Sequence, residues 1–293
     1  MAIATGNPAG TPAGGQTGSA SVMQRYYRRF TALERVMHAA LMLTFVGCAL
    51  SGLPLLYADK PWATTLARIL GGFEGAGLIH RICAFVMIVV FTTHVATVFY
   101  KAIAGGRLMK ILWGPDSMVP QLQDGIDIWR NFMWFIGRGP QPQFDRWTYW
   151  EKFDYWAVFW GMFIIGGSGL LLWFPVFFSK LLPGWMFNIA ALVHGEEALL
   201  AVGFIFTFHF FNGHVRPAKF PMDTVIFTGR ISEHEMKGER SVQFERFARE
   251  GRLAADEAPP PTAESRWFGW VVGGTALALG ILAIVLIVYS IFS

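Results

Sequence analysis

Histidine is the residue type best placed to do chemistry in this sequence, because five of the seven histidines fall inside long apolar segments. A lone imidazole in such a segment is usually a hydrogen-bonded structural side chain, so the spacing between histidines is the informative feature. His80 and His94 lie about 21 Å apart along one helix, and His194 and His209 about 22 Å apart along another. Each pair stays within about 60° of one helix face. Two helices would therefore each present one imidazole near each membrane surface, and His38 adds a fifth in an earlier segment.

This arrangement favours two b-type haems stacked across a membrane, each iron held by two neutral imidazoles. Zinc is excluded, because it needs three or four ligands within about 2 Å of one point. Covalent c-type haem would need a Cys-x-x-Cys-His motif, which the sequence lacks. Intramembrane histidines also serve proton relays, and Glu196 and Glu197 follow His194 closely. A proton-conducting transporter or channel subunit is thus the alternative, although we find no convincing repeat between the halves of the sequence.

Composition excludes a water-soluble globule, since 54% of the residues are hydrophobic and only 15% are charged. We expect an all-α integral membrane protein with a four-helix haem-binding bundle and a fifth C-terminal transmembrane helix. Nucleic-acid binding is not expected, because the net charge of +4 comes from basic residues collected in loops. The predicted spans are Val36–Leu56, Leu78–Tyr100, Tyr155–Phe178, Ile189–Phe211 and Phe268–Phe292.

The basic residues also predict the orientation. Lys and Arg are abundant before the first span, between the second and third, and between the fourth and fifth, whereas the other two loops hold only Lys60, Arg68 and Lys180. By the positive-inside rule the N-terminus is cytoplasmic and the C-terminus periplasmic, in a bacterial inner membrane.

The domain organisation follows from these spans. Residues 1–28 are predicted to be a disordered tail, 29–213 the dihaem core, 214–266 a cytoplasmic connector and 267–293 the fifth helix. Within the long loop 101–154 an amphipathic interfacial helix is expected from Gln121 to Phe135. A short helix is expected in the connector around Ser232–Arg249, and the glycines of the third span are interpreted as helix-packing residues.

Several motifs together resemble a known family. They are Arg35-Val-Met-His38, Ser51-Gly52, Leu78-Ile-His80, Glu151-Lys152, Gly169-Leu-Leu-Leu-Trp173-Phe-Pro175, Leu192-Val-His194 and His209-Phe-Phe. From about Arg29 to Arg240 the chain resembles the dihaem cytochrome b subunit of membrane-bound formate dehydrogenases and nickel–iron hydrogenases. The resemblance implies two haems b and an electron path between a periplasmic partner and the quinone pool. That partner would be an iron–sulfur subunit or a multihaem c-type cytochrome of the same complex.

The resemblance also implies haem ligands. His80 and His194 would hold the haem near the outer surface, and His38 and His209 the haem near the cytoplasm. His94 departs from this pattern and is similar to a ligand of cytochrome b in quinol:cytochrome c oxidoreductases. His38 and His94 therefore compete for the cytoplasmic-side iron; we favour His38, and a third haem remains an alternative.

Further site residues are expected near the two membrane surfaces. Arg35 and Arg81 are candidates to bind haem propionates, with lipid phosphate as the alternative ligand. Glu151 and Lys152 resemble the quinone-site segment of the family, although a plain interfacial salt pair is the alternative. His214 would lie about 140° around an α-helix from His209, at a quinone site or simply at the membrane surface.

Overall fold

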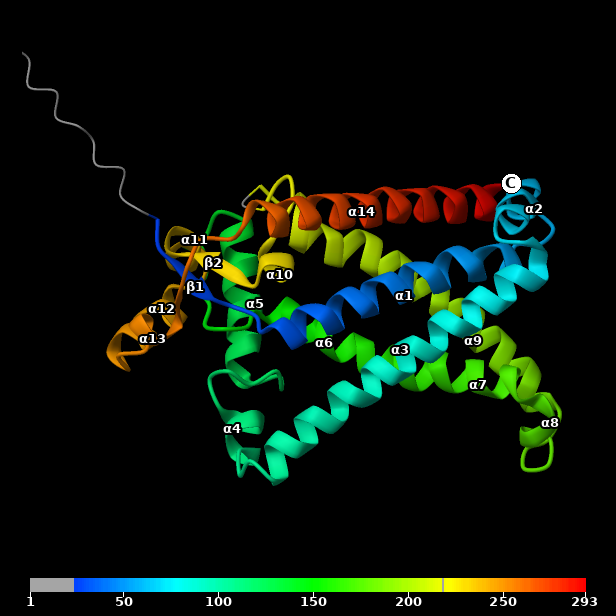
Figure 1. Cartoon of the computed structure of the whole chain (residues 1–293), viewed down its shortest axis with the longest axis horizontal. Coiled ribbons are helices and arrows are strands. Elements are labelled where there is room, and N and C mark those ends of the chain that lie inside the picture. The colour runs from blue at the N-terminus through cyan, green and yellow to red at the C-terminus, as the bar shows by residue number, and fades with distance from the viewer. Residues whose placement is uncertain (1–23, 218) are drawn as a thin grey trace, which may run out of the picture.

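The structure is a computed structural model that describes residues 24–217 and 219–293. The chain is 74% helical, and five helical segments are long and apolar enough to cross a membrane, which confirms the all-α membrane bundle. They are α1 (Ala32–Leu56), α3 (Gly72–Ile103), the third span Tyr149–Trp173, the fourth span Trp185–Val215, and α14 (Ala263–Phe292). Figure 1 shows them side by side, with α14 ending at the side of the molecule opposite to β1.

The third and fourth spans are not uniform α-helices. The third consists of α6 (Tyr149–Gly161), the π-helix η1 (Met162–Gly166) and α7 (Gly167–Trp173). The fourth consists of α9 (Trp185–Phe204) followed by the π-helices η2 (Ile205–His209) and η3 (Phe211–Val215). The predicted third span, Tyr155–Phe178, is corrected at both ends. It begins six residues earlier and stops at Trp173, because Pro175 disfavours helical geometry at Phe174, and Pro175–Phe178 form a separate helix, α8.

The helices pack as two close pairs, α1 with α3 and α7 with α9. The fifth helix is part of this core rather than a separate element. Val46, Leu53, Phe206 and Ala283 belong to one buried cluster that joins α1, the fourth span and α14. A Cβ atom at Gly280 would lie 2.2 Å from Phe206 Cδ1, so α14 can approach the fourth span closely only with glycine at this position.

At one end of the spans the two chain segments outside the core form a small cap. It consists of β1 (Tyr26–Arg28), α10 (Val225–Thr228), β2 (Arg230–Ser232), α11 (Glu233–Glu239), α12 (Ser241–Arg249), α13 (Leu253–Asp256) and β3 (Glu257–Ala258). The strand order is β2-β1-β3, both pairings are antiparallel, and Tyr27 lies opposite Ile231 and Glu257. We call this side the cap end, and the side that carries α2 (Pro61–Ile69) and α8 the α8 end (Figure 1).

The cap corrects two predicted boundaries. Residues 26–28 belong to the central strand of a sheet and not to a tail, whereas residues 1–23 lie outside the described residues. The predicted helix at Ser232–Arg249 is two helices, α11 and α12, with Arg240 between them in a non-helical conformation. Tyr27 is buried with Ile231, Met236 and Phe247, so the connector folds around the strand that precedes the first span.

The predicted helix in the long loop is confirmed as α5 (Leu122–Phe135), which follows the short α4 (Leu108–Trp113). In Figure 1, α5 lies across the direction of the spans at the cap end. Its polar face is turned inward, where Asp124 and Asp127 are buried, while Leu122, Trp129 and Phe135 are exposed. Apolar side chains on the outer face are expected of a helix that lies in the lipid interface.

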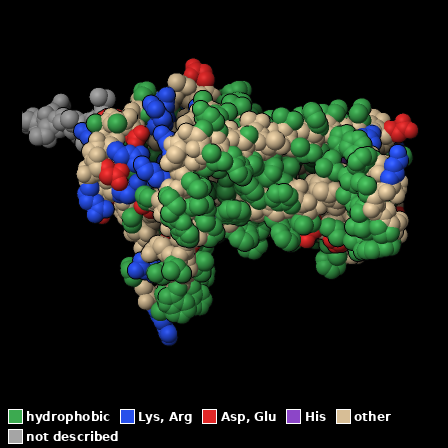
Figure 2. All heavy atoms as spheres, turned by 90° about the horizontal axis from the view of Figure 1, so that it is seen from below, with side chains coloured by type: hydrophobic (Ala, Val, Ile, Leu, Met, Phe, Trp, Pro, Cys, Tyr) green, Lys and Arg blue, Asp and Glu red, His purple; other side chains and the backbone are tan. Residues whose placement is uncertain are grey.

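The surface agrees with a membrane-spanning core. Figure 2 shows mostly hydrophobic side chains along the length of the spans, with Lys and Arg concentrated at the cap end. The protein is therefore a multi-pass membrane protein.

Candidate functional site

The clearest site is a pair of histidines from two different spans, near the α8 end. His80 on α3 and His194 on α9 have ring centroids 6.0 Å apart, and their ring planes are inclined by 76°. The sequence predicted this pair only through a resemblance, and the structure brings the two side chains together.

The same nitrogen of each ring is engaged by the neighbouring helix. His80 Nδ1 lies 3.1 Å from the carbonyl oxygen of Cys48, and His194 Nδ1 lies 2.9 Å from that of Ile165. A carbonyl oxygen can only accept a hydrogen bond, so Nδ1 is the protonated nitrogen in both rings. Both Nε2 atoms therefore carry a free lone pair, which is the form in which histidine binds a metal.

We call the carbonyl, serine and glycine that surround each imidazole its cradle. The two cradles are built in the same way. Ser51 Oγ lies 3.3 Å from His80 Nδ1, and Ser168 Oγ lies 3.4 Å from His194 Nδ1. In each case the serine stands three residues after the residue whose carbonyl binds the imidazole, and a glycine follows it. A Cβ atom at Gly52 would lie 3.1 Å from His80 Cε1, and one at Gly169 would lie 3.0 Å from His194 Cε1. Gly169 therefore makes room for an imidazole, which the sequence interpretation of general helix packing had not recognised.

This donor set fits a haem iron. A ligating imidazole nitrogen lies about 2 Å from its metal, so the 6.0 Å between the two ring centroids would allow both side chains to hold one iron. Protein side chains alone bury no residue in the central part of α3 or of the third span. These two spans thus have apolar surface that a bound macrocycle could cover.

A second group of histidines lies near the cap end. His38 on α1 is close enough to His209 and His214 on the fourth span to interact with both electrostatically. His209 Nδ1 lies 2.9 Å from Asp154 Oδ2 on α6. A carboxylate accepts the proton of Nδ1, so this ring too has Nε2 free as a ligand. His38 and His209 therefore form a second candidate axial pair, and Asp154 is a site residue that the sequence analysis missed.

The expected separation of His214 from His209 does not hold. The angle of about 140° assumed an α-helix, but η2 and η3 are π-helical, as the bond from Arg216 N to Phe211 O at 3.0 Å illustrates. In a π-helix residues five apart are bonded across one turn, so His214 follows His209 along the same side of the span. The Nδ1 atom of His214 is buried and has no hydrogen-bond partner among the described residues.

His94, the competitor of His38, has a different neighbour. Its Nε2 atom lies 2.9 Å from the hydroxyl oxygen of Tyr155 on α6, and the two ring centroids are 5.5 Å apart. The nitrogen that would bind iron is thus in a hydrogen bond in this structure. This contact favours His38 as the partner of His209.

Glu151 and Lys152, the residues expected at a quinone site, have partners within the protein. Glu151 Oε1 accepts from Arg240 at 2.8 Å and from Arg29 at 3.4 Å, and Oε2 accepts from the backbone N–H of Thr148 at 2.8 Å. Lys152 Nζ donates to Asp124 at 2.8 Å. Glu151 joins α6 to Arg29, which lies between β1 and α1, and to Arg240 in the turn between α11 and α12.

Arg240, the partner of Glu151 in the cap, shows how strongly this ion pair is stabilised. Burial alone would lower the pKa of Arg240, but its hydrogen bonds and attraction to Glu151 outweigh burial and raise the pKa. An ion pair in which both partners are hydrogen-bonded in this way holds the segments that carry them together. Glu151 and Lys152 thus both form ion pairs, as the alternative interpretation expects, and their place at a quinone site stays a prediction.

The two arginines expected to bind haem propionates lie in different settings. Arg81 is exposed on α3, directly after His80. Arg35 lines a hollow between α1 and the cap, and its Nε atom is buried with no hydrogen-bond partner among the described residues. Neither contacts a carboxylate in the described part of the chain, so both remain candidates for an anionic ligand.

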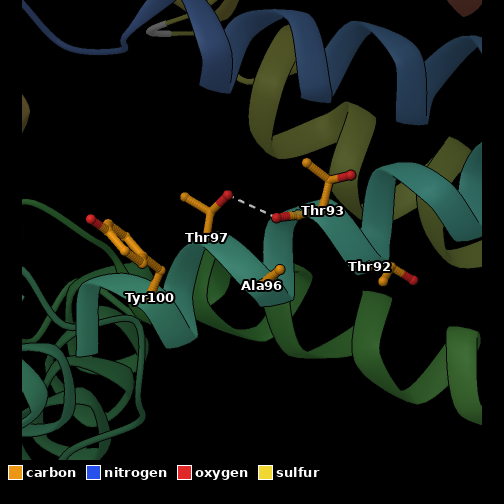
Figure 3. Close-up of a pocket in the computed structure, with 5 residues that line it drawn as sticks. All are labelled: Thr92, Thr93, Ala96, Thr97 and Tyr100. Atoms are coloured by element: carbon orange, nitrogen blue, oxygen red, sulfur yellow. Dashed lines mark hydrogen bonds between the residues drawn. The ribbon is translucent and has the colours of Figure 1, made fainter. Parts of the chain in front are cut away.

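A second hollow contains none of these residues. Figure 3 shows that its lining comes from α3 alone, with Thr97 bonded back to the carbonyl of Thr93 at 2.8 Å. It is open and shallow, and no histidine contributes to it, so we assign it no chemistry. Its lining residues are Thr92, Thr93, Ala96, Thr97 and Tyr100.

The five-span fold and the family match together give the class of the protein, a membrane cytochrome b. Residues 29–211, more than half of the chain, match the family model of prokaryotic cytochrome b561, and the chain belongs to this family. The family includes the cytochrome b subunit of nickel–iron hydrogenases, which implies haem b, electron transfer, and association with other subunits of a redox complex. Among the curated proteins compared with the chain, none matches it.

Proposed function

We propose that this chain is the quinone-reactive dihaem subunit of a membrane oxidoreductase complex. It would pass electrons between a redox partner at the α8 end and a quinone at the cap end. The observation that carries the proposal is the His80–His194 pair, whose rings are 6.0 Å apart and whose Nδ1 atoms both bond to backbone carbonyls. Bound haem would supply one-electron redox chemistry at each level of the bundle.

The chain's own residues would hold two haems b. His80 and His194 would bind the first, with the carbonyls of Cys48 and Ile165 fixing the tautomer of each ring. His38 and His209 would bind the second, with Asp154 orienting His209. His94 remains the competing ligand at that level.

For the quinone, His214 is the better candidate than Glu151 or Lys152. Its buried Nδ1 atom has no partner among the described residues, whereas Glu151 and Lys152 are both held in ion pairs. A quinone oxygen bonded to His214 would lie near the haem of His38 and His209, and protons would exchange at the cap surface.

The orientation completes the proposal. Because the basic loops lie at the cap end, that end would face the cytoplasm of a bacterial inner membrane and the α8 end the periplasm. The partner would be a periplasmic iron–sulfur subunit or a multihaem c-type cytochrome. Each electron crossing between the haems would then move with or against the membrane potential, which is worth about 2.3 kcal/mol per 100 mV.

Two measurements on the purified full chain test the proposal. A pyridine haemochrome assay should give two haems b per chain, and a value of zero would eliminate the electron-transfer function and favour the proton-conducting alternative. Anaerobic mixing with a quinol analogue should reduce the cap-end haem, and His214→Ala should slow this reduction while leaving both haem spectra intact. If Glu151→Gln slows quinol oxidation and His214→Ala does not, the quinone belongs beside α6 instead.

A further inference from the structure

The arginine-lined hollow between α1 and the cap contains none of the proposed haem-ligating or quinone-binding histidines. It lies where the N-terminus of α1 meets the sheet, and α1, β1, β2, β3 and the turn before β2 all contribute to its lining. Arg28 comes from β1, Arg35 from α1 and Arg230 from β2, so three segments far apart in the sequence each supply one guanidinium group. Glu257 is the acidic residue in the lining, and its side chain is exposed.

These three arginines differ from others in and around the cap. Arg29 and Arg240 bind Glu151, Arg216 binds Glu239, and Arg246 binds Asp116 and Asp145. In contrast, Arg28, Arg35 and Arg230 form no ion pair with a described carboxylate. Arg230 donates only to the carbonyl oxygens of Pro259 and Pro260, at 2.7 and 2.6 Å.

The Nε atom of Arg35 is a further difference from the ion-paired arginines of the cap. It has no hydrogen-bond partner among the described residues, although burying an unpaired charged donor is costly. The cap leaves space for this side chain because residue 229 is a glycine, where a Cβ atom would lie 2.9 Å from Arg35 Cδ. The free N–H groups at the start of α1 do not account for the site. Glu34, in the first turn of this helix, already accepts a hydrogen bond from the backbone N–H of Thr31 at 2.8 Å.

We propose that this hollow binds the phosphate headgroup of an anionic phospholipid. Guanidinium groups present paired N–H donors that match phosphate oxygens, and three of them against one exposed glutamate leave a net positive charge. The hollow lies at the junction of a membrane-spanning helix with a charged cap, which is the depth of lipid phosphates. Val36 lies one turn along α1 from Ala32, which lines the hollow, and is 65% exposed, so it would carry the start of the acyl chain. A free phosphate would not use that apolar surface.

The test uses the full chain in a neutral detergent and follows its thermal unfolding. Dihexanoyl-phosphatidylglycerol is the probe, with dihexanoyl-phosphatidylcholine and inorganic phosphate at matched ionic strength as comparison ligands. A ligand that binds the folded state raises the unfolding temperature, and the rise grows with the ratio of ligand concentration to Kd. We expect the largest rise with phosphatidylglycerol, and an affinity about tenfold weaker for each of Arg28→Gln and Arg230→Gln.

A matched control removes two other exposed arginines on the same side of the molecule, Arg138→Gln with Arg249→Gln, and should keep the full effect. If Arg28→Gln with Arg230→Gln also keeps it, the proposal is wrong. If inorganic phosphate stabilises the wild type as much as the lipid does, the ligand is a free anion and the lipid assignment fails. If the Arg28→Gln variant shifts the spectrum or potential of a haem, the hollow holds a haem propionate. Haem content is read separately from lipid affinity, so this result does not depend on the proposed electron transfer.

Discussion

The two levels of histidines in this bundle differ in what holds them. At the α8 end, His80 and His194 have matching environments, with a carbonyl, a serine and a glycine supplied to each by the adjacent helix. At the cap end, His209 is held by a carboxylate, His94 meets a tyrosine, and His214 has a buried nitrogen without a described partner. The first level is built from backbone and small residues, and the second from ionisable and hydroxyl-bearing side chains.

This difference separates the tasks of the two levels. A backbone carbonyl cannot titrate, so it fixes an imidazole without linking it to proton movement. A carboxylate raises the basicity of the ligand that it orients and can exchange protons. On the proposed function, the α8-end pair would serve electron transfer alone, while the cap-end group would serve redox chemistry in which protons also move.

The largest expected effect comes from removing axial ligands. His80→Ala or His194→Ala should each abolish one of two haems, because a bis-histidine site that keeps a single imidazole loses half of its iron–protein bonds. At the cap end, His209→Ala and His38→Ala should abolish the other haem, whereas His94→Ala should leave both. The pyridine haemochrome assay counts the haems, and His234→Ala, an exposed histidine of α11, is the control. Two haems in the His80→Ala protein would refute the pairing, and exchanged results for His38 and His94 would assign His94 to the iron.

Asp154→Asn should affect only the cap-end haem. The amide can still accept from His209 Nδ1, but the negative charge is lost, and replacing such a partner typically weakens metal binding about 10- to 100-fold. A less basic ligand also favours reduced iron, so the midpoint potential of the cap-end haem should rise. A redox titration followed by visible absorbance separates the two haems. Equal shifts of both potentials would indicate a general change in the bundle rather than a contact with His209.

Adding a methyl group to the glycine cradles tests the α8-end pair. Gly169→Ala would place a Cβ atom 3.0 Å from His194 Cε1, which should displace the ring and cost about 1–3 kcal/mol of stability. Gly52→Ala should act in the same way on His80. Gly167→Ala, two residues from Gly169 with nothing within 4 Å of its added atom, is the matched control. Haem retention after dialysis and the unfolding temperature report the effect, and equal losses in the control would show that helix packing, not the imidazole, requires glycine.

The smallest effect is expected from the serine hydroxyls. Ser51→Ala and Ser168→Ala should each cost about 1 kcal/mol or less, because the carbonyl of Cys48 or Ile165 still holds Nδ1. The electron paramagnetic resonance signal of the oxidised α8-end haem should shift, since it depends on the relative orientation of the two rings. If Ser51→Thr keeps the wild-type signal, the hydroxyl group is responsible for the shift. A change confined to the cap-end signal would contradict the assignment of these serines.

Long apolar segments and helical periodicity in the sequence predicted much of this architecture. The five apolar segments, the amphipathic helix at Gln121–Phe135 and the intramembrane histidines could all be read directly, because lipid allows few alternatives to a continuous apolar helix. The ends of the elements were less certain. Pro175 ended the third span earlier than hydropathy suggested, since proline restricts the backbone of the residue before it.

Local departures from the α-helix could not be predicted from the sequence. The angle expected between His209 and His214 assumed 100° per residue, and the π-helices of the fourth span changed it. The repeated Ser-Gly and histidine cradles also escaped notice, although Ser51-Gly52 and Ser168-Gly169 stand in the sequence. The signal was present, but only the crossing of α1 with α3 and of α7 with α9 shows which carbonyl each imidazole meets.

The sequence by itself determined the membrane-spanning core, the level of each histidine along its helix, and the family, since periodicity and hydropathy act along a single chain. The tertiary structure decided the partners. It placed Glu151 between Arg29 and Arg240 rather than in an open site, paired His209 with Asp154, and gathered Arg28, Arg35 and Arg230 around one hollow. These contacts join segments far apart in the chain, and their energies depend on distance and burial, which no pattern along the sequence records.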